Sequence, residues 1–160
     1  VTSRPVTGSL PRILVAVSAS IFLPARDYAA LRLERRHRKA RKLARQLATA
    51  PPERRHQLRI RLKKLRYAAE FASSLFPGKK ADRYARRLAA LQDALGLAND
   101  AVVAERVAGQ LVEKLGSSPD LLRAAGFLTG WAAHAANHEI AALPGLWERF
   151  ESVGRFWPKR

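Results

Sequence analysis

Apolar residues recur every three to four positions through the middle of the chain and predict an amphipathic helix there. These positions are Leu58, Leu62, Leu65 and Ala69. At about 100° per residue they fall within about 60° of one another, which is the width of a buried helix face. Pro51-Pro52 and Glu53 are typical of a helix start, and Pro77-Gly78 of a helix end. The pattern therefore predicts one helix between these two breaks.

Two further helices are predicted on either side of this central one. The first extends from about Arg26 to Ala48, and the second begins at about Ala81. The break at Pro51-Pro52 is short enough to make the first helix an antiparallel neighbour of the central helix. Their apolar positions are Leu33, Ala40, Leu43, Ala44 and Leu47 in the first, and Tyr84, Leu88, Leu91 and Leu95 in the second.

The pattern is interrupted at Gly96, and a new helix is expected to follow it. Asn99 or Asp100 is placed to cap the start of that helix, and this capping role is favoured over ligand contact. Gly116 is expected to end it. Its expected inward positions are Val103, Val107 and Leu111.

Another helix is predicted to start at Ser118-Pro119-Asp120, which combines a cap, a proline and an acid in the first turn. It is expected to end near Leu143. The last segment, Leu146 to Trp157, contains Trp147, Phe150, Phe156 and Trp157, which most simply cover the end of a bundle. Since no alternating strand pattern appears, the sequence predicts an all-α antiparallel bundle of about five to six helices.

The N-terminal residues are expected to stand apart from this bundle or to add to it. Residues 1–24 form a leader with one apolar run, Ile13 to Leu23, and residues 25–160 form the helical domain. Eleven residues are too few to cross a bilayer. The run has features of a signal peptide, but a buried helix of the bundle is the favoured interpretation. Because the chain starts with Val rather than Met, we expect it to have been trimmed or to begin inside a longer product.

Composition narrows the class of partner. The 160 residues carry a net charge of +17 with a pI near 11.5, and a field of that strength attracts polyanions such as nucleic acid, anionic membrane or polyphosphate. Cysteine is absent, which excludes disulfides and thiolate zinc sites. We therefore expect a cytoplasmic, polyanion-binding protein with no cofactor.

The positive charge is concentrated between Arg32 and Arg66, where fifteen Lys or Arg residues accompany two acids. On the central helix, one row lies opposite the apolar face and extends about 15 Å. The row consists of His56, Arg59, Lys63 and Arg66, and the preceding helix adds Arg35, Arg38 and Lys42. A solvated face is the simpler interpretation, but such faces normally carry i,i+4 acid–base pairs, which are nearly missing here. The row is therefore a candidate anion-binding site.

Two blocks of this sequence resemble a known family. His56-x-x-Arg59-x-x-x-Lys63-Lys64-Leu65-Arg66-Tyr67 is followed by Leu91-Gln92-x-x-Leu95-Gly96-x-x-Asn99-Asp100. This order is similar to that of the CHAD family, an α-helical histidine domain that binds inorganic polyphosphate. The resemblance covers roughly residues 25–157 and only the C-terminal half of a two-half domain. It implies that His56, Arg59, Lys63 and Arg66 line a polyphosphate channel, with Lys64 turned aside by the helix.

Nucleic-acid binding and catalysis are the alternatives to polyphosphate binding. A nucleic-acid binder is the main alternative, but single-strand binders interleave aromatics with basic residues, and no aromatic lies between Arg32 and Arg66. An enzyme is not expected, because phosphoryl chemistry usually needs metal-binding carboxylates and the acids near the row are few. No membrane partner is expected. A homodimer or a missing N-terminal half would complete the channel, and association with polyphosphate granules would follow from binding.

His134 and His138 have the i,i+4 spacing that can hold a metal. The zincin pattern is not met, since Ala142 stands where a second histidine would follow His138-Glu139. We therefore expect ordinary core or surface histidines and no metal site.

Overall fold

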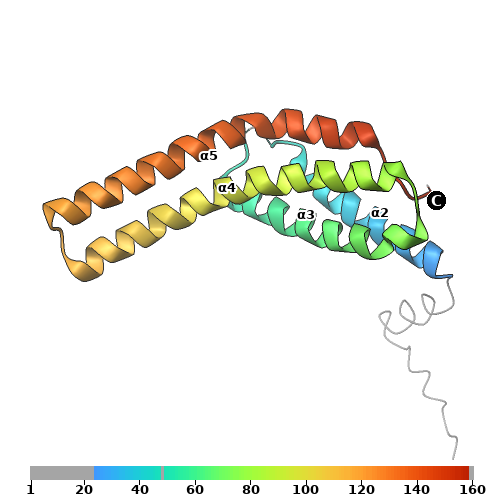
Figure 1. Ribbon diagram of the computed structural model, residues 1–160, viewed down its shortest axis with the longest axis horizontal. Helices are drawn as coiled ribbons and strands as arrows, with labels where there is room; N and C mark the ends of the chain where they lie inside the picture. Colours follow the sequence, from blue (N-terminus) through green and yellow to red (C-terminus); the bar gives the residue numbers. More distant parts are fainter. Residues whose placement is uncertain (1–23, 48, 159–160) are drawn as a thin grey trace, which may run out of the picture.

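A computed structural model describes residues 24–47 and 49–158, and it is helical throughout apart from the connections (Figure 1). Its helices are α2 (Ala25–Ala44), α3 (Pro52–Ala72), α4 (Lys79–Leu115) and α5 (Pro119–Val153), with a short 3-10 turn, η1 (Ser73–Leu75), after α3. No strand occurs in the residues described, so the all-α expectation is confirmed for them. The predicted helix over Ile13 to Leu23 lies outside the described residues.

The number of helices is lower than expected: the described ranges hold four long helices rather than five to six. α4 continues through Gly96, and α5 continues through Pro144. A helical glycine costs about 1 kcal/mol relative to alanine, which is less than burial of the adjacent Leu95 returns. The predicted break after Gly96 is therefore wrong, and Asn99 lies inside α4 instead of capping a new helix.

A leucine core joins the four helices. Leu58, Leu62 and Leu65 of α3 are at most 1% exposed, and each such side chain contributes about 1.5–3 kcal/mol on burial. The other predicted apolar positions are buried too, except Leu43, which is half-buried against the same cluster. They are Leu33, Ala40, Ala44, Leu47, Ala69, Tyr84, Leu88, Leu91 and Leu95. The sequence therefore located this core correctly on three helices.

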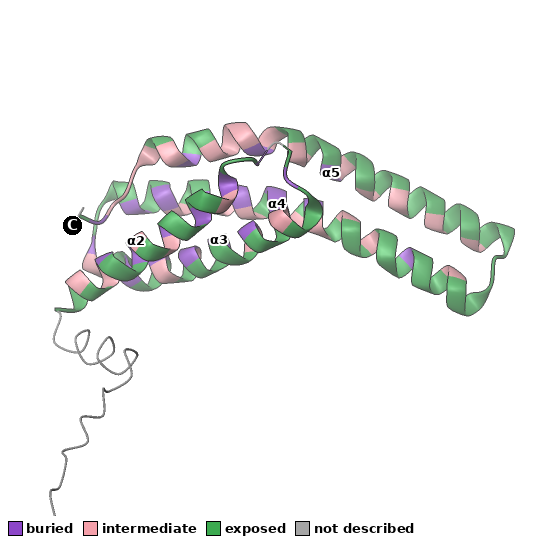
Figure 2. Ribbon diagram, turned by 180° about the vertical axis from the view of Figure 1, so that it is seen from behind, coloured by how far each residue is buried: buried purple, intermediate pink, exposed green. Residues whose placement is uncertain are grey.

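Beyond the bundle, α4 and α5 continue side by side as a two-helix arm (Figure 1). Exposed residues dominate this arm, whereas buried residues concentrate where all four helices meet (Figure 2). The expected inward positions Val103, Val107 and Leu111 are wrong, because all three are exposed. Ala108 is buried instead. The reason lies in the neighbouring helix. α5 is rich in alanine beside this part of α4, so the two helices pack closely through small side chains. The larger side chains of α4 therefore lie to the side of this contact.

The aromatic residues of the last segment close the bundle, as expected. Phe150 and Trp157 are buried, and Trp147 and Phe156 pack half-buried against the same core. Trp157 Nε1 also donates a hydrogen bond of 3.2 Å to Glu34 Oε2 of α2. The segment after α5 is thereby held against the start of the domain.

A buried histidine links α2 to α4 and α5. His37 Nδ1 lies 3.0 Å from the Tyr84 hydroxyl, and His37 Nε2 lies 3.3 Å from Glu151 Oε1. Burial lowers the pKa of His37 below its usual 6.5, and the nearby Glu151 carboxylate opposes that shift in part. Arg155, Glu34 and Arg41 exert smaller effects of both signs. The folded protein therefore favours neutral His37.

This polar contact predicts a pH-dependent stability. As the pH falls below about 6.5, the unfolded chain takes up the His37 proton before the folded one, so unfolding becomes more favourable. His37→Gln should flatten the fall in urea midpoint between pH 7 and pH 5, while costing about 1–3 kcal/mol at pH 7. His134→Gln, at an exposed position on α5, is the control. Equal flattening of the fall in both variants would contradict this role of His37.

Candidate functional site

The predicted row of basic residues lies on the side of α3 that faces α4. Packing of the α3 leucines toward the core fixes the rotation of the helix, and this places Arg59, Lys63 and Arg66 beside α4. The three line a hollow of about 220 Å³ together with Tyr67, Gln92 and Asp93. His56 continues the row toward the N-terminal end of α3, where it contacts α4 directly. The structure therefore brings all four predicted residues of the row to one flank of α3.

Amide side chains of α4 orient two members of this row. His56 Nδ1 lies 2.7 Å from Asn99 Oδ1, and Arg66 Nη1 donates to Gln92 Oε1 at 3.1 Å. Because the side-chain oxygen of Asn99 accepts this hydrogen bond, Nδ1 of His56 carries a proton. Nε2 of His56 takes no part in this contact. Asn99 was expected to be a helix cap, so its role here was missed by the sequence analysis. The signal was present, since Asn99 belongs to the second motif block.

Arg66 is the one member of the row that pairs with an acid in the part of the chain that the structure describes. Its Nε lies 2.6 Å from Glu70 Oε1, one turn along α3. This hydrogen bond and the carboxylate charge raise the pKa of Arg66 above its usual value. Arg59 rests against α4 at Gly96, where a Cβ atom would come 3.9 Å from Arg59 Nε. Arg59 and Lys63 have no ion pair within the described residues, and Asp93 is the acid that lines their hollow.

A second basic surface lies on the opposite flank of α3, against α2. It surrounds a smaller hollow of about 110 Å³. Its lining consists of Arg32, Arg35, Arg36, Lys39, Arg61 and Lys64. Among the described residues no acid lines this hollow, so six like charges face one another. Lys64 is thus turned away from the row as expected, and Arg35 accompanies it.

The remaining predicted residues are not brought to either surface. Arg38 and Lys42 are exposed on α2 and line neither hollow. Arg61 was missed as a site residue, although it lies one turn from Lys64 on the same face and could have been found from that spacing. Arg36 was expected to need an acid, a carbonyl or a bound anion, and it lies half-buried among cations.

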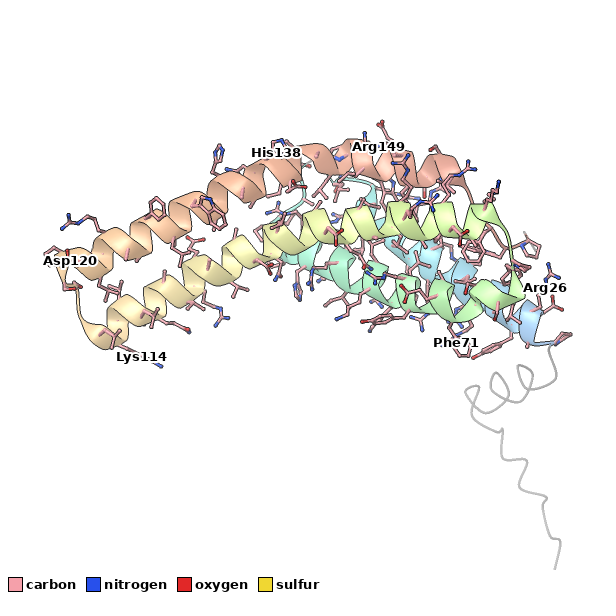
Figure 3. All side chains as sticks on the ribbon, viewed as in Figure 1. Arg26, Phe71, Lys114, Asp120, His138 and Arg149 are labelled. Carbon is pink, nitrogen blue, oxygen red and sulfur yellow. The ribbon has the colours of Figure 1, made fainter. Side chains whose placement is uncertain are left out.

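An exposed apolar ridge separates the two basic surfaces. Ile60, Tyr67 and Phe71 form it along α3, and Phe71 is 87% exposed. Figure 3 labels Phe71 at the C-terminal end of α3. Lys63 Nζ lies 5.9 Å from the ring centre of Tyr67, within cation–π range. Tyr28 of α2, 40% exposed, lines one hollow between α2 and α3 together with Tyr67 and Phe71. Tyr67 was expected at the edge of the row, whereas Phe71 and Tyr28 are aromatic neighbours that the sequence did not suggest.

The two histidines of α5 are both exposed. His138 Nδ1 lies 3.5 Å from Glu139 Oε1. Within residues 24–47 and 49–158 no group of three or more His, Asp or Glu side chains is arranged to hold a metal. In the same ranges no helix combines the length and the apolar character needed to span a bilayer.

Comparison with known proteins identifies a family. The family model for the CHAD domain matches residues 6–109, which cover α2, α3 and most of α4. The match therefore includes both basic surfaces and leaves out the end of the arm and α5. No curated protein and no solved structure matches the chain.

Repulsion between the crowded cations of the second surface should lower the free energy of unfolding by a measurable amount. Lys64→Gln should raise the free energy of unfolding by a few tenths of a kcal/mol at low salt, because it removes like-charge contacts. The gain should disappear at about 1 M salt, where screening acts over about 3 Å. Urea titrations at both salt concentrations measure this. Arg123→Gln is the control, since Arg123 pairs with Asp120 at 3.1 Å and its loss should not stabilise. A Lys64 variant no more stable than the parent at low salt contradicts the prediction.

Proposed function

The chain belongs to the CHAD domain family, and we propose that it binds inorganic polyphosphate without catalysis through the row of His56, Arg59, Lys63 and Arg66. The observation that supports this most is the placement of these four side chains on one flank of α3, next to amides of α4. A row of about 15 Å matches a linear polymer better than a single small anion.

The chemistry of each side chain suits a chain of phosphates. Polyphosphate has no bases to distinguish, so its recognition depends on charge-assisted hydrogen bonds at regular spacing. The guanidinium of Arg59 can bind two phosphate oxygens at once, and Lys63 supplies a compact charge. Asn99 holds Nδ1 of His56, which leaves Nε2 to meet the polymer as a donor when the ring is protonated. The row therefore offers several contacts in series.

The second basic surface extends the same proposal. Lys64 and Arg35 would attract phosphate from the α2 side, with Arg38 and Lys42 adding charge further out on α2. The Ile60–Phe71 ridge lies between this surface and the row, so one short polymer would not contact both at once. We assign the row the principal contacts, because α4 amides orient it, and the second surface a supporting attraction.

Nucleic acid is the alternative partner. The exposed rings of Tyr67, Phe71 and Tyr28 favour it, because bases stack on aromatic side chains next to basic grooves. Polyphosphate cannot use those rings. The two partners therefore predict different effects of Phe71→Ala: no change in polyphosphate affinity, but a loss of single-stranded DNA affinity if DNA is the ligand.

Two further parts of the proposal concern how the channel is completed and where in the cell the protein lies. A channel around the polymer would need a second basic wall opposite the row, and either a homodimer or an N-terminal half would supply it. The proposed location is the cytoplasm, together with polyphosphate granules. No catalytic role is proposed, because the row presents donors, with Glu70 and Asp93 as its nearby acids.

Removing two charges from the row tests the proposal. Arg59→Ala with Lys63→Ala should weaken polyphosphate binding about 100-fold or more, since each lost charge-assisted bond is worth about 1.5–3 kcal/mol. The slope of log affinity against log salt should become shallower by about 2. Both quantities come from fluorescence titrations at several salt concentrations.

The matched control removes the same charge elsewhere. Arg83→Ala with Arg87→Ala takes two exposed arginines from α4, and neither lines a basic hollow. Its affinity should fall by less than about 5-fold, as expected for long-range charge alone. Equal losses in both folded double variants would show that net charge, and not the row, determines binding.

A further inference from the structure

The arm formed by residues 100–137 is held together by small side chains. Ala108 of α4 and Ala136 of α5 are buried between the two helices, and Ala104, Ala125 and Ala132 are half-buried along the same seam. α2 and α3 end near the base of the arm and do not cover it (Figures 1 and 2). Its larger apolar side chains consequently remain outside the seam.

These larger side chains gather on one side of the arm. On α4 they follow a four-residue spacing, and they are 38–70% exposed: Val103, Val107, Leu111 and Leu115. On α5 they are Phe127, Leu128 and Trp131, which are 79%, 46% and 65% exposed. Both stripes are centred about 100° of helix rotation from the alanine seam, in the direction that brings them to the same side of an antiparallel pair. We call this side the arm face.

The arm face is large enough for a stable interface. The exposed parts of its seven apolar side chains amount to on the order of 800 Å², about what one partner contributes to a standard protein–protein interface. Monomeric proteins rarely expose contiguous apolar patches above a few hundred Å². An exposed apolar face of this area, among the residues described, is typical of a surface that binds a partner.

Charge indicates what that partner is. Residues 100–137 hold three of the chain's 30 Lys and Arg residues and four of its 13 Asp and Glu residues. The arm is therefore close to neutral in a strongly basic protein, and neither a polyanion nor an anionic membrane is drawn to it. Another near-neutral apolar face fits it best, and a second copy of the chain offers one.

We propose that the arm face binds the arm face of a second copy, with the two arms antiparallel. Counted equally from the turn between α4 and α5, Val107 lies level with Phe127, so a two-fold axis would pass near these residues. α4 would then stack on α4 and α5 on α5, which completes a four-helix bundle. Phe127, the most exposed of the seven, would lie near the centre of the interface.

The antiparallel direction follows from the basic bundles at the arm bases. A parallel pair would bring two highly positive bundles together. An antiparallel pair separates them by the length of the arm, about 25 Å, which exceeds the screening length of about 8 Å at physiological salt. Repulsion between the two copies is then small, and this dimer leaves the second wall of the channel to an N-terminal half.

The same register pairs opposite charges at the ends of the interface. Lys114 and Asp100 are both seven residues from Val107, so Lys114 of one copy would meet Asp100 of the other. Asp120 and His134 are likewise seven residues from Phe127, so the carboxylate of one copy would meet the imidazole of the other. Lys114 and Asp120 lie at the tip of the arm, remote from the bundle (Figure 3). Most of the arm face also lies outside the residues matched by the family model.

Sedimentation measurements without polyphosphate test the pairing. The parent protein should form dimers as its concentration rises, and Phe127→Glu should raise the dimer dissociation constant at least about 30-fold, as for a central interface residue. Leu122→Glu is the matched control, because Leu122 is 47% exposed on the opposite side of α5. A parent that stays monomeric, or equal losses in both variants, would overturn the proposal, as would a monomer that binds lipid vesicles through Phe127.

Charge exchange tests the register independently. Lys114→Glu and Asp100→Lys should each weaken the dimer several-fold, and the double variant should restore the parent constant within about 3-fold. Absence of this rescue would exclude the antiparallel register. Circular dichroism of each variant checks that the helices are retained. Because no polyphosphate is present, the outcome is independent of the proposed function.

Discussion

Burial of the α3 leucines is the constraint on which the basic surfaces depend. The same helix face that places Leu58, Leu62 and Leu65 in the core fixes where every cation of α3 points. Each buried leucine stabilises the fold by about 1.5–3 kcal/mol, whereas each like-charge contact on a helix costs only a few tenths. The core therefore dominates and the repulsion persists. A bound polyanion would relieve that repulsion, so stability and binding would be coupled through one helix.

The two flanks of α3 differ in how well their charges are ordered. On the α4 flank, Asn99 and Gln92 hold His56 and Arg66 by hydrogen bonds. On the α2 flank, six cations surround a hollow with no acid in its lining. A row held by hydrogen bonds loses less side-chain entropy when it binds, whereas a cluster of like charges provides mainly long-range attraction. This difference supports a specific role for the first flank and a general role for the second.

Local patterns predicted much of the bundle and of the row. The apolar spacing of α2, α3 and the first half of α4 was sufficient, because burial there follows helix rotation alone. The same rotation predicted that Lys64 turns away from the row. The predictions that were wrong concern positions whose burial or contacts depend on the neighbouring helix. Gly96 looked like a break, but packing of Leu95 carries α4 through it, and Asn99 then meets His56 instead of capping a helix. Val103, Val107 and Leu111 have the spacing of a core face, but Ala108 forms the contact with the alanines of α5 instead, which the spacing within α4 alone does not show.

Selectivity between polyanions is the most direct test of the central claim. We would titrate the parent protein with labelled long-chain polyphosphate at two salt concentrations, and then add single-stranded or duplex DNA of equal total charge. The row predicts tight polyphosphate binding that neither DNA displaces. Displacement by DNA at equal charge would contradict it, and would show that the basic surfaces attract any polyanion.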